Sequence, residues 1–447
     1  MLRLSAIIII CLCLCGCRSV RQARQAQLPE NIPAGERTIT AAEAGLADNS
    51  VLTLARAMEI ALVYHPSIVQ AKQSLVIALK QSDDAVAGYL PTLNANASYR
   101  RATMNYNPAG PKTNEANNSL SPSISLNQLV YDFGRTSASI HQAHENQLAS
   151  EANLRTTENN IAYNVRQAYY GLIRQQALVK VAEEAERQSK GYLEQVKSLV
   201  KVGRRPKYDI TRSEVDLNNA RLNLVRAQNG LKTARATLNN TLGLAERTKY
   251  LIEEPALEEF KSGFDELIAR ARANHPGLIA QTARVRAASA AVDRAIAELY
   301  PSLSLNHGYN WSGSDFPLVW NWAFGTLLDW NLFSGFRKTS LIDQSVASLR
   351  IARATKTELE QYIYLELSRA GDQLEDARER LSLTTSIGRQ AEENLDLTQK
   401  RYKIGSASSV ELTDAQAMLT NVRSQLAEAQ YDYQITIAFI KKTIGEK

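Results

Sequence analysis

The sequence is poor in the residues that end helices and in those that cross-link small domains. Proline occurs 12 times in 447 residues and never after Pro317, and glycine occurs 21 times. Because these two residues most often end a helix, their scarcity indicates a chain made mostly of long helices. All four cysteines lie between Cys11 and Cys17. A disulfide framework is therefore excluded for the rest of the chain.

Motifs of catalysis and of nucleic-acid binding are also missing. The chain has no glycine-rich phosphate loop, no G-x-S-x-G sequence and no paired-cysteine motif. Its 52 Lys+Arg against 46 Asp+Glu give a net charge of +6 that is scattered, so no basic stripe for nucleic acid is present. His141 and His144 could share a metal from one helix, but we expect no acid or cysteine beside them and predict no metal site. The sequence thus indicates neither an enzyme nor a cofactor-binding protein.

The N-terminus has the features of a bacterial lipoprotein signal. Arg3 precedes an apolar run that is too short for a permanent membrane anchor, and the run ends in Leu14-Cys15-Gly16-Cys17. This ending resembles a lipobox, so we predict that residues 1–16 are a signal peptide and that Cys17 becomes the lipidated first residue. The alternative is a plain signal peptide that happens to be rich in cysteine. Residues 17–50 lack a clear periodicity, and we expect them to form an extended tether.

Much of the remaining chain occurs twice. His65-Pro66 returns as His275-Pro276, and the stretch Y-L-P-T-L at 89–93 returns as L-Y-P-S-L at 299–303 with the same offset. We therefore divide the chain into repeat 1, residues 51–250, and repeat 2, residues 251–447. In each repeat we expect a helix that begins at the proline of the His-Pro pair, then a β-hairpin, then a long helical hairpin.

Apolar and polar residues alternate with a period of two at about residues 92–132 and 302–331, which predicts a β-hairpin in each stretch. Four such strands per chain cannot close a transmembrane barrel, because closed barrels start at about eight strands, so several chains must share one barrel. Two chains would give eight strands and three would give twelve, and the sequence does not decide between them. Only the twelve-stranded barrel leaves room for water inside. Aromatic residues at strand ends are typical of a membrane interface. The residues that we assign to such an interface are Trp311, Trp320, Trp322 and Trp330.

After each hairpin the chain turns helical for a long way. Residues 136–202 and 337–403 contain no proline, and helices of this length reach on the order of 100 Å. The helices that return from them carry apolar residues every seven positions, which is typical of a coiled coil. The first return has Leu217, Leu224, Leu231 and Leu238, and the second has Leu419, Leu426, Tyr433 and Ile440.

Between each long helix and its return lies a turn with a glycine, which we predict to adopt a positive φ at a helix C-terminus. The first turn is basic and the second acidic. The turn residues that we single out are Val202, Gly203, Arg204, Arg205, Asp209 and Arg212 in the first, and Ile404, Gly405, Ser406, Glu411 and Asp414 in the second.

The order of elements and several motifs together resemble the TolC-like outer-membrane efflux channel family. Besides the duplicated proline motifs, these are Y-D-F-G-R, L-F-S-G-F-R and Y-K-I-G-S-A-S-S-V-E-L-T-D-A, in fixed order from about Leu52 to Lys442. The resemblance implies a mainly α chain with a membrane β portion. It implies a homotrimer in which a long α-helical coiled-coil barrel is continuous with a 12-stranded transmembrane β-barrel, four strands per chain.

The same resemblance assigns roles to the turns. Glu411 and Asp414 match two acidic positions that ring the periplasmic mouth of such channels, and Asp209 is the acid of the first turn. Arg204, Arg205 and Arg212 are candidate pairing partners for these acids. The competing interpretation of Glu411 is a capping box with Ser408, and the basic residues could equally be solvated charges. Val202, Gly203, Ile404, Gly405 and Ser406 are the expected docking residues for a periplasmic adaptor, which would join the channel to an inner-membrane pump.

We therefore expect an outer-membrane export conduit that extends into the periplasm, while the cargo, small molecule or protein, stays undetermined. The alternative is a lipid-anchored coiled-coil scaffold without a pore. That alternative explains the helices and Cys17 but gives the four strands no role.

The lipidation of Cys17 is directly testable. Because the cysteine sulfur is the only attachment point that the lipobox offers, Cys17→Ala with an intact signal should abolish acylation. Mass spectrometry of the mature N-terminus reads this out, and an unmodified N-terminus in the unaltered protein would overturn the prediction.

Overall fold

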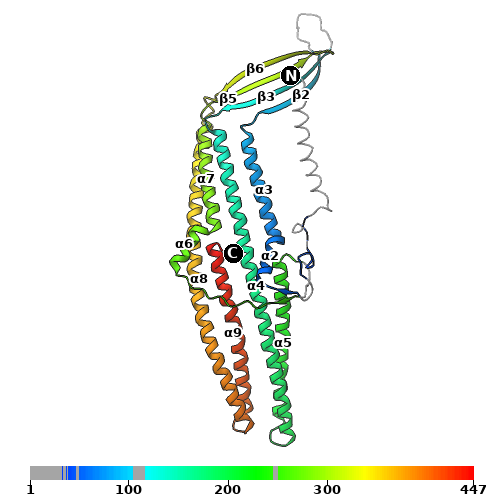
Figure 1. The fold of residues 1–447 in the computed structure, drawn as a ribbon, viewed down its shortest axis with the longest axis vertical. Coiled ribbons are helices and arrows are strands. Elements are labelled where there is room, and N and C mark those ends of the chain that lie inside the picture. The colour runs from blue at the N-terminus through cyan, green and yellow to red at the C-terminus, as the bar shows by residue number, and fades with distance from the viewer. Residues whose placement is uncertain are drawn as a thin grey trace. The chain divides into compact units, whose positions relative to one another are not determined.

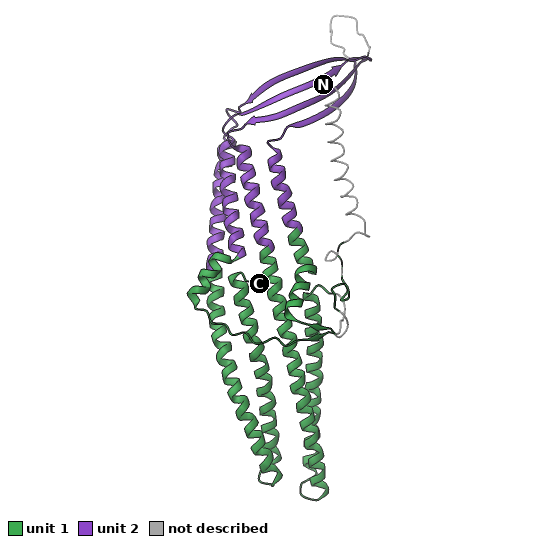
Figure 2. Cartoon of the chain, in the orientation of Figure 1, with its two compact units in different colours: residues 1–72, 155–275, 362–447 green, residues 73–154, 276–361 purple. Residues whose placement is uncertain are grey.

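The computed structural model of the protein describes residues 33, 37, 39–46, 50–103, 116–244 and 250–446. These residues form two compact units (Figure 2). Unit 1 comprises Met1–Lys72, Arg155–His275 and Tyr362–Lys447, and unit 2 comprises Gln73–Leu154 and Pro276–Gln361. Each unit takes segments from both halves of the chain, so the units cut across the division into residues 51–250 and 251–447.

The elements follow one another in the same order in both halves (Figure 1). The first half has β1 (Val51–Leu52), α2 (Leu54–Tyr64), α3 (Pro66–Ala87), β2 (Thr92–Thr103), β3 (Ala116–Tyr131), α4 (Arg135–Lys201) and α5 (Tyr208–Thr241). The second has β4 (Leu251–Ile252), α6 (Phe264–Asn274), α7 (Pro276–Ala297), β5 (Ser302–Ser312), β6 (Val319–Asp329), α8 (Arg337–Lys403) and α9 (Ser409–Ile444). Helices α4 and α8 have 67 residues each.

The His-Pro pairs separate two helices rather than opening one. Helices α3 and α7 begin at Pro66 and Pro276, as predicted. The short helices α2 and α6 before them were not predicted. They end at Tyr64 and Asn274. Their C-caps, His65 and His275, have the extended backbone that a following proline favours. The sequence signal for α2 was Thr53, whose side chain caps the helix by accepting a hydrogen bond from the Arg56 amide.

In unit 2 the four long strands form one antiparallel sheet in the order β2-β3-β5-β6. The alternation seen in the sequence gives this sheet an apolar and a polar face, because residues paired directly across antiparallel strands point to the same side. On the apolar face Tyr309 pairs with Trp322, and Trp311 with Trp320. The second hairpin is slightly shorter than predicted, since β6 ends at Asp329 and leaves Trp330 just beyond it.

Two residues in left-handed backbone conformation precede each of the longest helices. Before α4 they are Phe133 and Gly134, with φ of 54° and 91°. Before α8 they are Gly335 and Phe336, with φ of 62° and 63°. A positive φ is costly for a bulky aromatic residue, so the surrounding structure must impose it at the passage from strand to helix.

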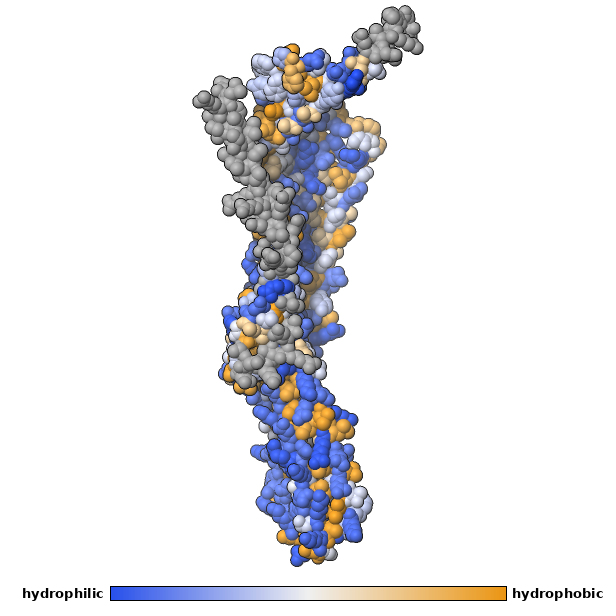
Figure 3. All heavy atoms as spheres, turned by 90° about the vertical axis from the view of Figure 1, so that its right-hand side faces the viewer, coloured by the Kyte–Doolittle hydropathy of each residue, from blue (hydrophilic) through white to orange (hydrophobic). Residues whose placement is uncertain are grey.

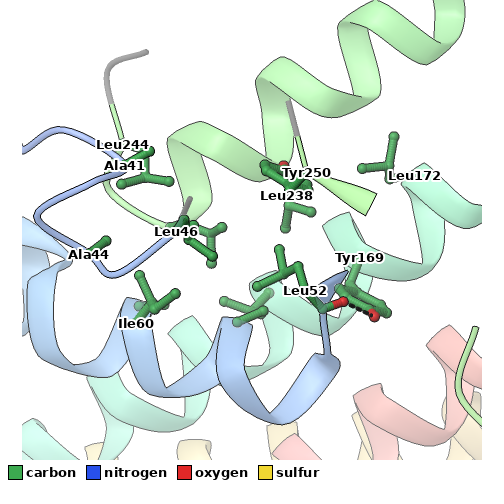
Figure 4. Close-up of a cluster of buried hydrophobic side chains, with 14 of the residues drawn as sticks. Ala41, Ala44, Leu46, Leu52, Ile60, Tyr169, Leu172, Leu238, Leu244 and Tyr250 are labelled. Atoms are coloured by element: carbon green, nitrogen blue, oxygen red, sulfur yellow. Dashed lines mark hydrogen bonds between the residues drawn. The ribbon is translucent and has the colours of Figure 1, made fainter. Parts of the chain in front are cut away.

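The core of unit 1 includes a segment that we had expected to be tether. Ile39, Ala41, Ala44 and Leu46 are all at most 5% exposed and belong to a cluster of buried residues with α2, α4 and α5 (Figure 4). Ile39 forms a parallel bridge with Leu244. The prediction of an extended tether up to residue 50 is therefore wrong for residues 39–46. A turn spaces these four apolar residues irregularly, so they show neither helical nor strand periodicity.

A tyrosine lies beside the short parallel pair β1–β4 at the edge of this core. The Tyr169 hydroxyl is 2.9 Å from the Leu52 carbonyl oxygen (Figure 4). It is 2.6 Å from the carbonyl oxygen of Glu253. With one proton it donates to one carbonyl at a time. Burial raises the pKa of Tyr169, so the hydroxyl stays protonated.

No helix among the described residues is both long enough and apolar enough to cross a membrane.

Removing the Tyr169 hydroxyl should weaken unit 1. Tyr169→Phe removes the hydroxyl that donates to the Leu52 or Glu253 carbonyl, while the Leu52 carbonyl keeps the Glu253 amide as a donor. We expect the loss of this hydrogen bond to lower the free energy of unfolding by about 0.5–1.5 kcal/mol. Tyr170→Phe is the matched control, because Tyr170 is also buried but its hydroxyl bonds to no other described residue. Urea unfolding in detergent measures both, and equal losses would show that the hydroxyl of Tyr169 contributes nothing specific.

Candidate functional site

The candidate site consists of the two turns that join α4 to α5 and α8 to α9, both in unit 1. The two long helices end in the same way. Gly203 and Gly405 have φ of 74° and 81°. The amide of each glycine and that of the next residue donate to carbonyls of the last helical turn, a Schellman motif. The predicted positive φ of both glycines is thereby confirmed.

The second turn leads into α9 through a complete capping box. The Glu411 amide donates to the Ser408 hydroxyl at 3.1 Å, and the Ser408 amide donates to the Glu411 carboxylate at 3.1 Å. Arg401 lies 3.4 Å from the same carboxylate. The hydrogen bonds with Ser408, and then the charge of Arg401, hold the pKa of Glu411 below its usual value. The capping interpretation of Glu411 is thus confirmed.

The first turn enters α5 differently. Its N-cap, Lys207, makes no side-chain capping bond. Asp209 stands in the first helical turn and is only 7% exposed. A carboxylate in the first turn interacts favourably with the helix dipole. The two turns therefore share their way of ending a helix but not their way of starting one.

A tip cluster of buried side chains packs the two helical hairpins together near these turns. It contains Tyr192 and Val196 of α4, Leu395 and Tyr402 of α8, and Leu412 and Leu419 of α9. Tyr192 and Tyr402 meet edge to face with their ring centroids 5.6 Å apart, and their hydroxyl oxygens are 3.4 Å apart. Burial, and then the hydrogen bond to Tyr402, raise the pKa of Tyr192. Sequence reasoning missed both tyrosines as site residues, although Tyr402 opens the motif quoted for the second turn.

The basic residues of the first turn have partners other than those we predicted. The Arg205 guanidinium carbon lies 4.9 Å from the centre of the Tyr402 ring, and Arg205 also donates to the Ala407 carbonyl at 3.5 Å. Burial raises the pKa of the Asp216 carboxyl, and the charge of Arg212 nearby partly offsets this rise. Within the described part of one chain, neither Arg204, Arg205 nor Arg212 forms an ion pair with Glu411 or Asp414.

Asp414 is exposed, one turn along α9 from Glu411. Its side chain makes no hydrogen bond or ion pair with the other residues that the structure describes. Of the two acids in this turn, Asp414 is therefore the one that is not needed to hold the helix.

The ends of both hairpins carry exposed apolar side chains. Val202 is 67% exposed and Ile404 80%, and Tyr208 and Val410 beside them are exposed as well. Gly203, Gly405 and Ser406 are also at the surface. Orange patches interrupt the largely hydrophilic surface at the lower end of the molecule (Figure 3). All five predicted docking residues are therefore accessible.

Other predicted residues lie away from the turns. Trp320, Trp322 and Trp330 are exposed, and the Trp330 ring nitrogen donates to the Leu299 carbonyl at 3.0 Å. Cys17 lies outside the described residues, so its lipidation stays a prediction.

An acidic residue lies beside His141 and His144, the pair considered for a metal. Glu145, which the sequence reasoning overlooked, lies 3.7 Å from the His141 ring nitrogen. Even so, the described residues contain no group of three or more His, Cys, Asp or Glu that could hold a metal ion.

Because Glu411 caps α9 and Asp414 does not, we predict that their substitutions differ. Glu411→Ala should speed amide hydrogen exchange in the first turn of α9, Glu411→Gln should do so less, and the control Asp414→Ala should leave it near the unaltered rate. A lowered folded-state pKa means that the carboxylate stabilises the turn above pH 4.5 and that this contribution is lost as the pH falls through the folded value. Equal exchange in all three variants would exclude a capping role.

Known proteins share this architecture. The model of the outer membrane efflux protein family matches residues 57–244 and 267–446. The chain is 25% identical over 346 residues to the outer membrane efflux protein BepC of Brucella suis, covering 76% of this chain and 75% of that protein. It is 22% identical over 393 residues to the outer membrane protein TolC of Vibrio cholerae, covering 85% and 87%.

A solved structure of CusC superposes with a TM-score of 0.80 at 20% identity, covering 93% of this chain and 95% of that one. At this identity the likeness shows the shared fold. The family model, in contrast, accounts for most of the sequence in two blocks. The chain belongs to the outer membrane efflux protein family.

Proposed function

We propose that this outer-membrane efflux protein works as a homotrimer, the channel component of a tripartite export system. The single observation that carries the proposal is the junction, in one chain, of a four-stranded amphipathic sheet with two very long helical hairpins. A scaffold has no use for a sheet that is apolar on one face and polar on the other. A conduit uses the sheet to cross the outer membrane and the helices to extend into the periplasm.

The need for further chains follows from the edges of the sheet. In the order β2-β3-β5-β6, the outer edges of β2 and β6 pair with no other described strand. Backbone groups left unpaired in lipid cost several kcal/mol each, so β6 of one chain needs β2 of the next. Three chains give twelve strands, enough to enclose water.

The helices support the same assembly. Val215 and Leu222 on α5, seven residues apart, are about half exposed, and so are Leu383 and Leu397 on α8. Apolar side chains repeated at heptad spacing on a helix surface are typical of a seam with another helix. We infer that neighbouring copies cover these positions and so close a coiled-coil barrel.

In this assembly each turn occurs three times around the periplasmic mouth. Asp414 then forms a ring of three carboxylates in a constriction, where low-dielectric walls focus their field on passing cations. Glu411 and Asp209 add to this charge while they also hold their helix starts. Arg204, Arg205 and Arg212 are candidate partners for the acids of a neighbouring chain.

The exposed apolar residues at the turns are the proposed contact with a periplasmic adaptor protein and, through it, with an inner-membrane pump. Val202 and Ile404 offer the apolar anchors that interfaces use at their centre. A lipid on Cys17 would fix the chain to the outer membrane independently of the sheet.

Single-channel recording in planar bilayers tests the proposal. Asp414→Asn should raise conductance and weaken block by multivalent cations, because it removes the carboxylate ring without disturbing the helix cap. Glu411→Gln should have a smaller effect in the same direction. Glu379→Gln is the control, an exposed acid on α8 roughly 35 Å along the helix from the turn.

An unchanged current in Asp414→Asn would remove this residue from the gate. A well-folded trimer with no conductance at all would exclude the channel and favour the lipid-anchored scaffold.

A further inference from the structure

The polar face of the four-stranded sheet is almost free of charge. Across the four strands the described charged residues are Arg100, Arg101 and Asp329. Arg101 lies on the apolar face, because neighbouring residues of a strand point to opposite sides. Arg100 and Asp329 lie on the polar face, since they pair with Ser119 and Ser302.

These two charges stand at opposite ends of the face. Arg100 is near the end of β2 that leads to residue 104, and Asp329 is at the end next to the helices. Four residues of strand, roughly 13 Å, separate Arg100 from Asn96, and the same length separates Asp329 from Gly325. The Debye length is only about 8 Å at physiological salt, so the middle of the face is shielded from both charges.

Between them, three rows cross all four strands, and we call these rows the neutral band. Each row takes one residue from β2, β3, β5 and β6 in turn. The rows are Asn96-Ser123-Asn310-Asn321, Asn94-Ser125-Gly308-Ala323 and Thr92-Asn127-Asn306-Gly325.

The neutral band has two properties that bear on what can pass it. None of its side chains is larger than asparagine. In the row through Gly308 and Ala323, β5 contributes no side chain and β6 only a methyl group. Its hydroxyl and amide groups both donate and accept hydrogen bonds, so they can solvate a cation, an anion or a neutral polar group. The face opposite, with Leu126, Tyr309 and Trp322, is the one suited to lipid.

We propose that the neutral band lines the outer-membrane section of the conduit and passes polar cargo without regard to the sign of its charge. This inference rests on the proposed channel function and adds the substrate class: bulky polar solutes, anionic, cationic or neutral. Because fixed charge is what discriminates ions in a narrow passage, discrimination by charge falls to the helical turns with Asp414. The sheet acts as a wide, hydrogen-bonding exit.

Thiol modification tests this with the full-length protein, because all four cysteines of the sequence lie between Cys11 and Cys17 and none lies in the strands. Ser123→Cys and Asn306→Cys place a thiol in the neutral band, and Ile124→Cys, one residue along β3, places it on the apolar face. A cationic and an anionic methanethiosulfonate of similar size are added at 0.15 M KCl from the side opposite the turns, so that neither reagent passes Asp414. Native electrophoresis checks that each variant is assembled.

We expect both reagents to reduce the current of Ser123→Cys and Asn306→Cys, at rates that agree within about threefold, and to leave Ile124→Cys unaffected. A preference of tenfold or more for one sign, the lower limit of electrostatic steering, would overturn the neutrality of the band. A conducting channel whose Ser123→Cys and Asn306→Cys thiols never react would show that this face does not line the path. An assembled but non-conducting unaltered protein would instead remove the channel function, and this inference with it.

Discussion

The backbone hydrogen bonds at the two edges of the sheet constrain everything else in this protein. The edge strands β2 and β6, of 12 and 11 residues, expose long rows of amide and carbonyl groups, and hydrocarbon offers no water to satisfy them. A chain with this sheet can be stable in a membrane only when its edges meet other edges. In the proposed assembly this constraint extends to the helices, because copies joined at the sheet would also have to be compatible along α4, α5, α8 and α9.

The helical hairpins must stay paired although they bury few side chains between them. The seam positions Leu217 and Leu238 on α5, and Leu419 and Ile440 on α9, are buried. Near the turns, aromatic residues replace leucine in the packing between helices. Tyr192, Tyr402 and the guanidinium of Arg205 form one packed group there. The first hairpin is thereby fastened to the second inside a single chain, where the two non-identical turns meet.

The sequence predicted what depends on local chemistry. The prolines that start α3 and α7, the alternation of the strands and the glycines at 203 and 405 all act within a few residues, so their patterns could be read directly. It did not predict that Ile39 pairs with Leu244, that Arg205 lies on Tyr402, or that residues 39–46 enter the core. These contacts join segments roughly 200 residues apart or follow an irregular turn, and no periodicity reports them. Glu411 was an intermediate case, because its cap is local while any ring of charge depends on other chains.

The two residues with positive φ before α4, and the two before α8, show how the two halves of the chain correspond. Glycine comes second in the first pair and first in the second, yet both residues of each pair have positive φ. What the halves share at this junction is therefore a backbone path, not a glycine. An alignment that places Gly134 on Gly335 shifts the long helices against each other by one residue, which is about 100° of rotation about the helix axis. Matching Gly134 to Phe336 instead restores equal helix starts at Arg135 and Arg337, and the same offset holds down to the turns, where Gly203 matches Gly405.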